Sequence, residues 1–146
     1  MMDVEGYWNE YKKKEGLSAD AEYFEAFSFG LNGEEADELL DLVLSGKKRA
    51  TTSVYLENER NPQTGDFSIV LNSKGEPSCI IKTTSVRIMR FKDMTFDICK
   101  KEGEDEILET WRITHEKMLK EEGKERGYEF SEDILILFEE FTVVCQ

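Results

Sequence analysis

Cations and hydroxyls gather in residues 46–53, GKKRATTS, in a pattern that could do chemistry. An apolar helical segment runs into Gly46, a residue type that suits the left-handed position just after a helix. Three cations follow at 47–49, and Thr51, Thr52 and Ser53 then open a β-prone run. A cationic helix end beside a hydroxyl-rich strand could hold an anion or activate a hydroxyl. Alternatively, the cations only complement the helix C-terminus.

Thr51 and Lys48 are the candidate reactive pair within this segment. A threonine hydroxyl is a weak nucleophile and needs an activating group. Lys48 lies three residues earlier, across the expected helix-to-strand turn, and could act as that base if it were neutral for part of the time. Burial and the neighbouring cations Lys47 and Arg49 favour the neutral amine, whereas a net charge of −13 opposes it. The sequence does not decide whether Lys48 is neutral or charged.

A second candidate cluster is Trp111, Arg112 and His115. Trp111 and His115 are one helical turn apart and would share a face. Trp111 could stack on a base, while Arg112 or His115 holds a carbonyl or phosphate group. Alternatively, Trp111 belongs to the core, His115 is its hydrogen-bonded neighbour, and Arg112 faces solvent or pairs with Glu109 or Glu116.

The alternation of side chains along the expected strand adds further candidate binding residues after the cations. Side chains two residues apart in a strand point to the same side, so Thr51, Ser53 and Tyr55 would share one face. These three could therefore line the same pocket.

Composition limits the kinds of partner. The 146 residues suit one domain with a core of its own. Nucleic-acid binding relies on phosphate neutralisation by Lys and Arg, so a net charge of −13 opposes long RNA or DNA. A neutral, nucleoside-sized ligand is compatible with this charge. An anionic membrane surface would instead repel the protein. Without a signal-peptide core or an apolar run of about 18 residues, we expect a cytoplasmic protein.

Metal and cofactor sites are not indicated. Cys79, Cys99 and Cys145 are far apart, and His115 is the only histidine, which argues against a zinc site or a disulfide framework. The acidic run 102–106, EGEDE, lacks the spacing of a calcium loop and is interpreted as a solvated turn. We therefore expect no metal and no cofactor.

The periodicity predicts mixed secondary structure in one domain. The segment SKGEP at 73–77 is typical of a hairpin turn. The aromatic-rich connector 17–32 is expected to be mostly irregular, with aromatic side chains that anchor it to the core or, alternatively, stack on bases. The expected helices are 3–14, 34–45, 93–102 with Asp93 as its N-cap, and 106–122; the expected strands are 50–56, 66–72, 78–90 and 132–144.

Several motifs together resemble a known family. SGKKRATTS is similar to the G-x-K-x-x-T signature of the ASCH domain, with Gly46, Lys48 and Thr51 at its fixed positions. FSFG at 27–30, GDFSIVLNSKGEPSCII at 65–81, CKKEGEDEILETWRITHEKM at 99–118 and ILILFEEFTVV at 134–144 resemble blocks of the bacterial stand-alone members. The resemblance implies an α+β fold: a PUA-like mixed β-barrel flanked by helices. Residues 1–146 would then form a single ASCH domain, with 1–24 as an N-terminal helical extension.

The resemblance also implies one of two functions, RNA binding or, in one branch, amide hydrolysis of N4-acetylcytidine. In that branch a lysine, a threonine and a glutamate carry the reaction, and Lys48, Thr51 and Glu102 stand at the corresponding places. Thr51 would attack the acyl carbonyl, Lys48 would take its proton, and Glu102, with a raised pKa, would protonate the departing N4. Alternatively, Glu102 is a surface charge before Gly103.

The leading hypothesis is therefore an amidohydrolase that acts on an N4-acylated, cytidine-like nucleoside. The alternatives are a non-catalytic ASCH module that binds RNA or a modified nucleotide in the same cleft, and an interaction module without a nucleic-acid role. The expected partner is a small nucleoside-like ligand or RNA. The residues expected to bind it are Gly46, Lys47, Ser53, Tyr55, Trp111, Arg112 and His115.

Overall fold

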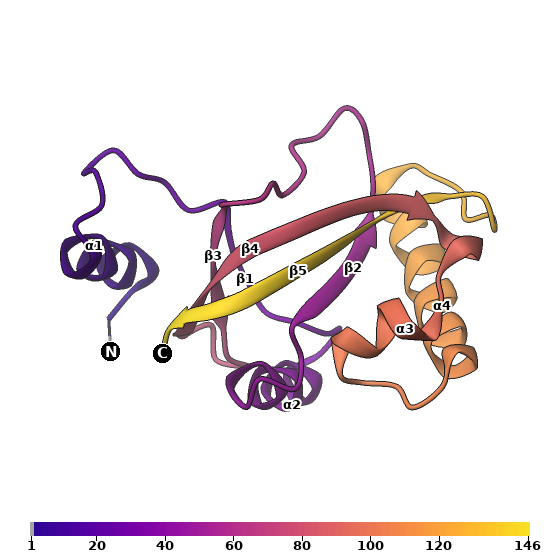
Figure 1. Ribbon diagram of the computed structural model, residues 1–146, viewed down its shortest axis with the longest axis horizontal. Helices are drawn as coiled ribbons and strands as arrows, with labels where there is room; N and C mark the ends of the chain where they lie inside the picture. The colour runs from indigo at the N-terminus through magenta and orange to yellow at the C-terminus, as the bar shows by residue number, and fades with distance from the viewer. Residues whose placement is uncertain (1) are drawn as a thin grey trace.

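The chain folds as an α+β domain, as the family resemblance implies, and its strands form one curled sheet (Figure 1). The computed structural model describes residues 2–146. The elements in chain order are α1 (Val4–Glu15), β1 (Glu25–Phe27), α2 (Gly33–Leu44), β2 (Ala50–Val54), β3 (Phe67–Leu71), β4 (Pro77–Arg90), the 3-10 turn η1 (Phe91–Asp93), α3 (Phe96–Cys99), the 3-10 turn η2 (Lys100–Glu102), α4 (Leu108–Arg126) and β5 (Leu135–Cys145).

The five strands form one sheet in the order β1-β3-β4-β5-β2. β3 and β4 are the antiparallel hairpin that the turn signal predicts, and the long strand β5 pairs antiparallel with both β4 and β2. The register between β4 and β5 shifts near Thr83–Ser85, a type of irregularity that bends a strand. The sheet curls into a half-barrel, whose edge strands are β1 and β2 (Figure 1).

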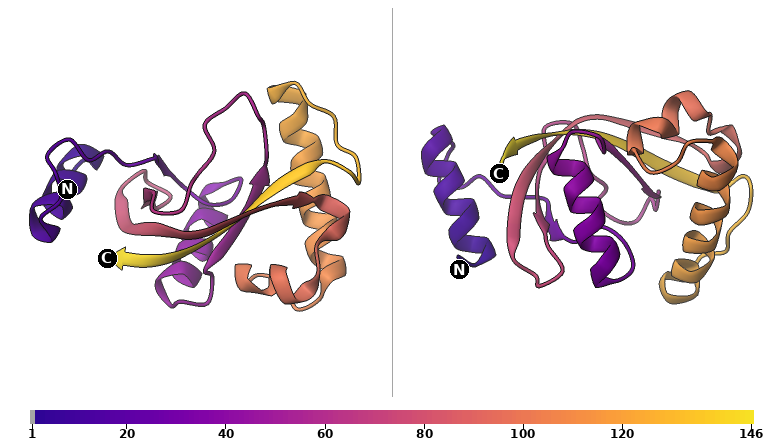
Figure 2. Two further views of the ribbon diagram at one scale, coloured as in Figure 1. Left: turned by 45° about the horizontal axis from the view of Figure 1, so that its top comes forward. Right: turned by 90° about the horizontal axis from the view of Figure 1, so that it is seen from below.

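Helices surround this sheet on separate sides. α2 lies along one side, α1 lies beyond one end, and α3 and α4 cover the opposite end (Figure 2). The apolar stripe of α2 packs Leu40 and Val43 against the sheet, and α4 packs Trp111 and Leu119 against β5. α1 adds a third cluster around Trp8. None of the helices within 2–146 combines the length and the apolar character that a membrane crossing requires.

One sequence expectation about elements is wrong. The helix expected over 93–102 is divided into η1, α3 and η2, and α3 begins after Thr95 rather than at Asp93. The connector 17–32 is mostly irregular, as expected, but it also contains β1, which pairs parallel with β3. β1 has only three residues, too few for a period-two pattern to stand out in the sequence.

Two glycines shape the ends of the segments that carry the candidate site. Gly46 follows the last turn of α2 with φ 80°, the left-handed conformation that the sequence predicts for it. Gly103 ends η2 with φ 75°, and a Cβ at this position would overlap with the carbonyl oxygen of Lys47. The segment after η2 therefore lies directly against the segment between α2 and β2.

Candidate functional site

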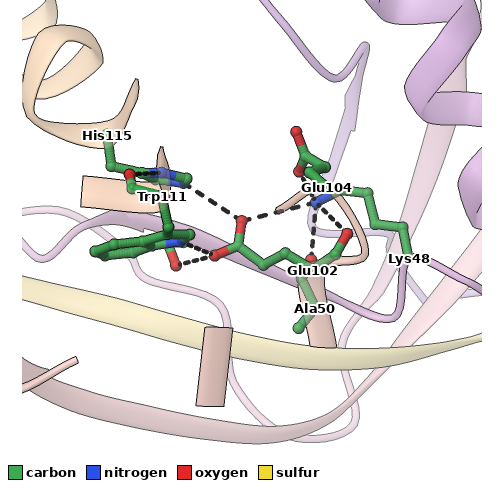
Figure 3. A network of polar contacts seen from close by, with 7 residues as sticks. Lys48, Ala50, Glu102, Glu104, Trp111 and His115 are labelled. Atoms are coloured by element: carbon green, nitrogen blue, oxygen red, sulfur yellow. Dashed lines mark hydrogen bonds and ion pairs between the residues drawn. The ribbon is translucent and has the colours of Figure 1, made fainter. Parts of the chain in front are cut away.

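A buried ion network lies between the start of β2, η2 and α4 (Figure 3). Lys48 is 2% exposed, and its ammonium donates to the carbonyl oxygen of Ala50 at 2.9 Å and to Glu104 Oε2 at 2.6 Å. It also lies 3.8 Å from Glu102 Oε1 and 3.5 Å from the Glu102 carbonyl oxygen. The three hydrogen-bond acceptors, the carbonyl oxygens of Ala50 and Glu102 and Oε2 of Glu104, match the three hydrogens of a charged ammonium group. The arrangement does not fit the neutral lysine base that was expected.

Glu102 is the centre of the network and is only 1% exposed, so the interpretation of a surface charge is wrong. Its Oε2 accepts hydrogen bonds from Trp111 Nε1 at 2.6 Å and from Thr52 Oγ1 at 2.9 Å. Its Oε1 lies 3.4 Å from His115 Nε2, opposite Lys48. Both carboxylate oxygens are thus contacted by groups from β2, from α4 and from the turn that precedes β2.

The charges of this network are mutually stabilised. Burial alone would raise the pKa of Glu102, but the hydrogen bond and charge of His115, the charge of Lys48 and the Trp111 hydrogen bond leave it below its ordinary value. Burial alone would lower the pKa of His115, but its hydrogen bond to Glu102 and the charge of that carboxylate leave it raised. The raised pKa expected for Glu102 is therefore wrong, because the donors outweigh desolvation. Glu102 is an ionised anchor rather than a proton donor.

Local backbone contacts bring these side chains together. The N–H of Arg49 donates to the carbonyl oxygen of Lys101, which joins the beginning of β2 to η2. The turn at Gly46 then directs Lys48 inward, where its ammonium reaches the end of η2. On α4, Trp111 and His115 stack with ring centroids 4.2 Å apart, so one helical turn presents both to Glu102.

A cavity of about 350 Å³ opens above the network. Lys48, Glu102 and His115 contribute to its lining, together with Thr51 and Thr52 of β2. Its volume is within the range of small-molecule sites. The arrangement gives a cavity with a fixed, charged floor and two hydroxyls in its wall.

A second cavity, of about 480 Å³, adjoins the first. Both cavities are lined by Phe29, Gly30, Thr51 and Thr52, so these residues lie at the boundary between the two cavities. The second cavity extends between the edge strands, with residues of β1 on one side and residues of β2 on the other. Thr51 therefore stands where the two cavities meet.

The sequence matches the ASCH domain family over residues 25–145. This chain belongs to the ASCH domain family. The matched segment includes the whole sheet and every residue of the buried network, and α1 lies outside it. Among curated proteins, none matches the sequence significantly.

Solved structures agree with this assignment. The chain is similar to the ASCH domain from Lactobacillus crispatus, with 30% identity, a TM-score of 0.85, and coverage of 99% of this chain and 97% of that one. It is also similar to protein EF3133 from Enterococcus faecalis, with 31% identity, a TM-score of 0.87, and coverage of 97% and 88%. The hypothetical protein PH0355 shares the fold alone, with 19% identity, a TM-score of 0.54, and coverage of 82% and 97%.

This ASCH domain brings together four of the residues that the sequence singles out. Lys48, Thr51, Glu102 and His115 all line the first cavity. Their chain segments are distant in sequence, and the fold places them around one space. The chemical roles of these residues stay predictions.

Other expected binding residues lie elsewhere. Trp111 is 0% exposed and packs between Phe91 and His115, so it cannot stack on a ligand and instead holds Glu102. Gly46 and Lys47 are exposed and line neither cavity.

Arg112, Ser53 and Tyr55 are also outside the first cavity. Arg112 reaches the Lys92 carbonyl oxygen at 3.4 Å and pairs with neither of the glutamates expected for it. Ser53 lines the second cavity, and Tyr55 lines a third, neighbouring one. The three residues of the shared strand face are thus distributed along a groove rather than gathered in one pocket.

Sequence reasoning missed three members of the site. Thr52 was passed over because its neighbour Thr51 occupies the family position. Glu104 was interpreted as part of a solvated turn, yet it pairs with Lys48 and its side chain is only 30% exposed. Phe29 anchors the connector to the core, as expected, but it also lines both cavities, and Lys48 Nζ lies 5.2 Å from its ring centroid. The acidic run around Glu104 carried a signal, since a buried lysine needs counter-charges.

Within residues 2–146, no group of three or more His, Cys, Asp or Glu side chains is arranged to hold a metal ion.

Proposed function

We propose that this ASCH domain is an amidohydrolase that acts on an N4-acylated, cytidine-like nucleoside, with Thr51 as its nucleophile. The observation that carries the proposal is the position of Thr51, in the wall where a cavity with a charged floor meets a second cavity. An amide substrate has two parts joined at the scissile bond. A nucleophile between two cavities can attack that bond while each part has its own space.

Thr51 differs from Thr52 in its availability. Thr52 donates its hydroxyl to Glu102 and is 6% exposed, so its hydrogen is already committed to the network. Within residues 2–146, no hydrogen bond joins the Thr51 hydroxyl to another side chain, and Thr51 is partly exposed. Thr51 is therefore the hydroxyl that a substrate carbonyl can reach.

The surroundings of Thr51 suit a developing oxyanion. β2 is an edge strand, so N–H groups on its outer side can donate to a carbonyl oxygen of the substrate. Lys48 contributes positive charge at the floor of the same cavity, and His115 adds to it when its imidazole is protonated. Because Glu102 and Glu104 hold these cations in place, little reorganisation is required during the reaction.

ASCH domains in general are associated with nucleic acids and include hydrolase-like members. A non-catalytic module that binds RNA or a modified nucleotide in the same cleft is therefore the competing function. The net charge of −13 favours a small neutral ligand over a polyanion.

The test is chromatographic detection of cytidine after incubation with a panel of N4-acyl cytidines, in the presence of a chelator. Wild-type protein should release cytidine, because the proposed reaction uses protein side chains. Thr51→Ala should abolish release while the protein stays folded, since it removes one partly exposed hydroxyl.

Thr142→Ala is the matched control, because Thr142 is an exposed threonine of β5 that lines neither cavity. It should keep the wild-type rate. If folded wild-type protein releases no cytidine from any substrate but binds one of them, the domain is a non-catalytic binding module and not an amidohydrolase. Full activity of Thr51→Ala would remove Thr51 from the reaction.

A further inference from the structure

Thr51 needs a base, and the ion network does not supply one. The hydrogens of the Lys48 ammonium are matched to Ala50, Glu102 and Glu104. Glu102 is likewise occupied, since donors contact both of its carboxylate oxygens.

A different carboxylate lies beside Thr51 on the sheet. Glu139 of β5 is the residue directly opposite Thr51 of β2 in the antiparallel register. Directly opposed residues project to the same face, with Cβ atoms about 4.5–5.5 Å apart. Thr51 and Glu139 both line the second cavity, so the hydroxyl and the carboxylate share one space.

Glu139 is half-buried and is held by a neutral donor. Thr83 Oγ1 donates to Glu139 Oε2 at 2.6 Å, which fixes the carboxylate and leaves Oε1 for another partner. Over residues 2–146, no ion pair involves Glu139. A carboxylate that is oriented but not neutralised by a cation retains its basicity.

The cations of the second cavity are engaged with other carboxylates. Arg60 pairs with Asp66 at 3.1 Å and lies over the Phe24 ring at 4.5 Å. Arg126 pairs with Glu122 at 3.2 Å and also with Glu59.

We propose that Glu139 is the general base that takes the proton from Thr51. This inference rests on the proposed amidohydrolase function and adds a catalytic residue to it. It also replaces the role first expected for Lys48.

The groups that face Glu139 favour such a role. Burial raises the pKa of its carboxyl, the Thr83 hydrogen bond opposes this, and the carboxylates of Glu25 and Asp66 add to the rise. Glu25 belongs to β1, across the cavity, and Asp66 immediately precedes β3. A base whose pKa is closer to neutral accepts a proton more readily at physiological pH.

The reaction balances with water as the only co-reactant. Thr51 Oγ1 bonds to the acyl carbon as its proton moves to Glu139, and the carbonyl becomes an oxyanion. The oxyanion re-forms the carbonyl, the bond from carbon to N4 breaks, and N4 takes the proton from Glu139. Water then attacks the Thr51 ester and gives a proton to Glu139. The ester bond breaks, Thr51 Oγ1 is reprotonated, and the carboxylic acid departs.

The experiment measures kcat/KM for N4-acetylcytidine from about pH 5 to 9. Glu139→Gln keeps the shape and an acceptor for Thr83, and it should lower kcat/KM by about 10²–10⁴-fold, mainly through kcat. It should also remove the acidic limb of the pH profile. Glu139→Asp should keep the limb and part of the rate, because it retains a carboxylate.

Glu140→Gln is the matched control. Glu140 is the next residue of β5, points to the opposite face, and binds Lys101 and Ser85 instead. It should keep the wild-type profile. Glu25→Gln should move the acidic limb to lower pH, because it removes a neighbouring negative charge, and this readout stands even if Glu139→Gln fails to fold.

The outcomes separate the two proposals. If wild-type protein is active while Glu139→Gln keeps both its rate and its acidic limb, Glu139 is not the base and only this inference fails. An effect on KM alone, or an acidic limb that Glu25→Gln leaves in place, would also contradict the inference. Inactive wild-type protein would overturn the proposed function itself, and Glu139 with it.

Discussion

Two adjacent threonines at the start of β2, Thr51 and Thr52, have different surroundings. Thr52 donates to Glu102 and so belongs to the buried network, whereas Thr51 faces the place where the two cavities meet. Alternation along a strand gives neighbouring residues different surroundings even when their chemistry is the same. Replacing one threonine should therefore affect fold stability, and replacing the other should affect the proposed reaction.

The buried ion network also predicts how stability depends on pH. The pKa of His115 is raised in the fold, so the stability that it contributes is complete below its unfolded value of about 6.5. That stability is lost as the pH rises through the higher folded value. The pKa of Glu102 is lowered, so its contribution is complete above about 4.3 and is lost as the pH falls through the lower folded value.

We therefore expect the free energy of unfolding to decline above about pH 6.5, with a slope of at most about 1.4 kcal/mol per pH unit for one proton. Urea denaturation at several pH values measures this decline. Because His115 is the only histidine, His115→Asn should flatten the slope between about pH 6 and 8 as well as lower the stability. An undiminished slope in His115→Asn would show that another group is responsible.

At the scale of elements, the site depends on how closely η2 approaches the beginning of β2. Gly103 makes this approach possible, because a side chain there would overlap with the Lys47 backbone. Gly75, in the β3–β4 turn, has nearly the same φ, 77° against 75°, but its surroundings are open. A comparison of alanine substitutions at the two glycines therefore distinguishes the cost of backbone strain from the cost of steric overlap.

Gly75→Ala should cost about 1–2 kcal/mol, the usual penalty for a left-handed residue with a side chain. Gly103→Ala should cost clearly more, because η2 must also move away from Lys47 and disturb the contact between Lys48 and Glu102. Denaturant unfolding of both variants measures the difference. Equal losses in the two variants would mean that the close approach at Gly103 is not structurally important.

The sequence predicted elements with strong patterns and missed those that depend on tertiary pairing. The alternation and turn around 66–90 predicted the β3–β4 hairpin, and the periodic stripe of α4 predicted Trp111 and His115 on one face. β1 was missed because three residues carry no clear period, and its partner β3 lies far along the chain.

The same distinction holds for the site. Lys48, Thr51 and Glu102 could be selected because short motifs carry them. Glu139 could not, because its position opposite Thr51 is set by the register between β2 and β5, which no local pattern specifies. The pKa of Glu102 was predicted in the wrong direction, since the groups that lower it most, His115 and Lys48, lie in other segments of the chain.

At the scale of the whole molecule, the incomplete closure of the sheet creates the groove. β1 and β2 are the two edges, and both line the second cavity. The groove is acidic on balance, since Glu25, Glu59, Glu122 and Glu139 line it along with two arginines. This local charge has the same sign as the net charge of −13.

Polymeric RNA should therefore bind weakly at physiological salt, no more tightly than about the micromolar range typical of non-specific binding. A filter-binding titration at several salt concentrations tests this expectation. Nanomolar affinity with a steep salt dependence would instead support an RNA-binding function, with phosphate contacts outside the acidic groove.

The most direct test of the central claim is mass spectrometry of protein that is rapidly quenched during turnover of N4-acetylcytidine. If Thr51 is the nucleophile, wild-type protein should carry a transient acetyl group, and digestion should locate it on the peptide that contains Thr51. Thr51→Ala should carry none, whereas Thr142→Ala should be acetylated as the wild type is. Release of cytidine by wild-type protein with the acetyl group on another residue, or an equal modification of Thr51→Ala, would contradict the account.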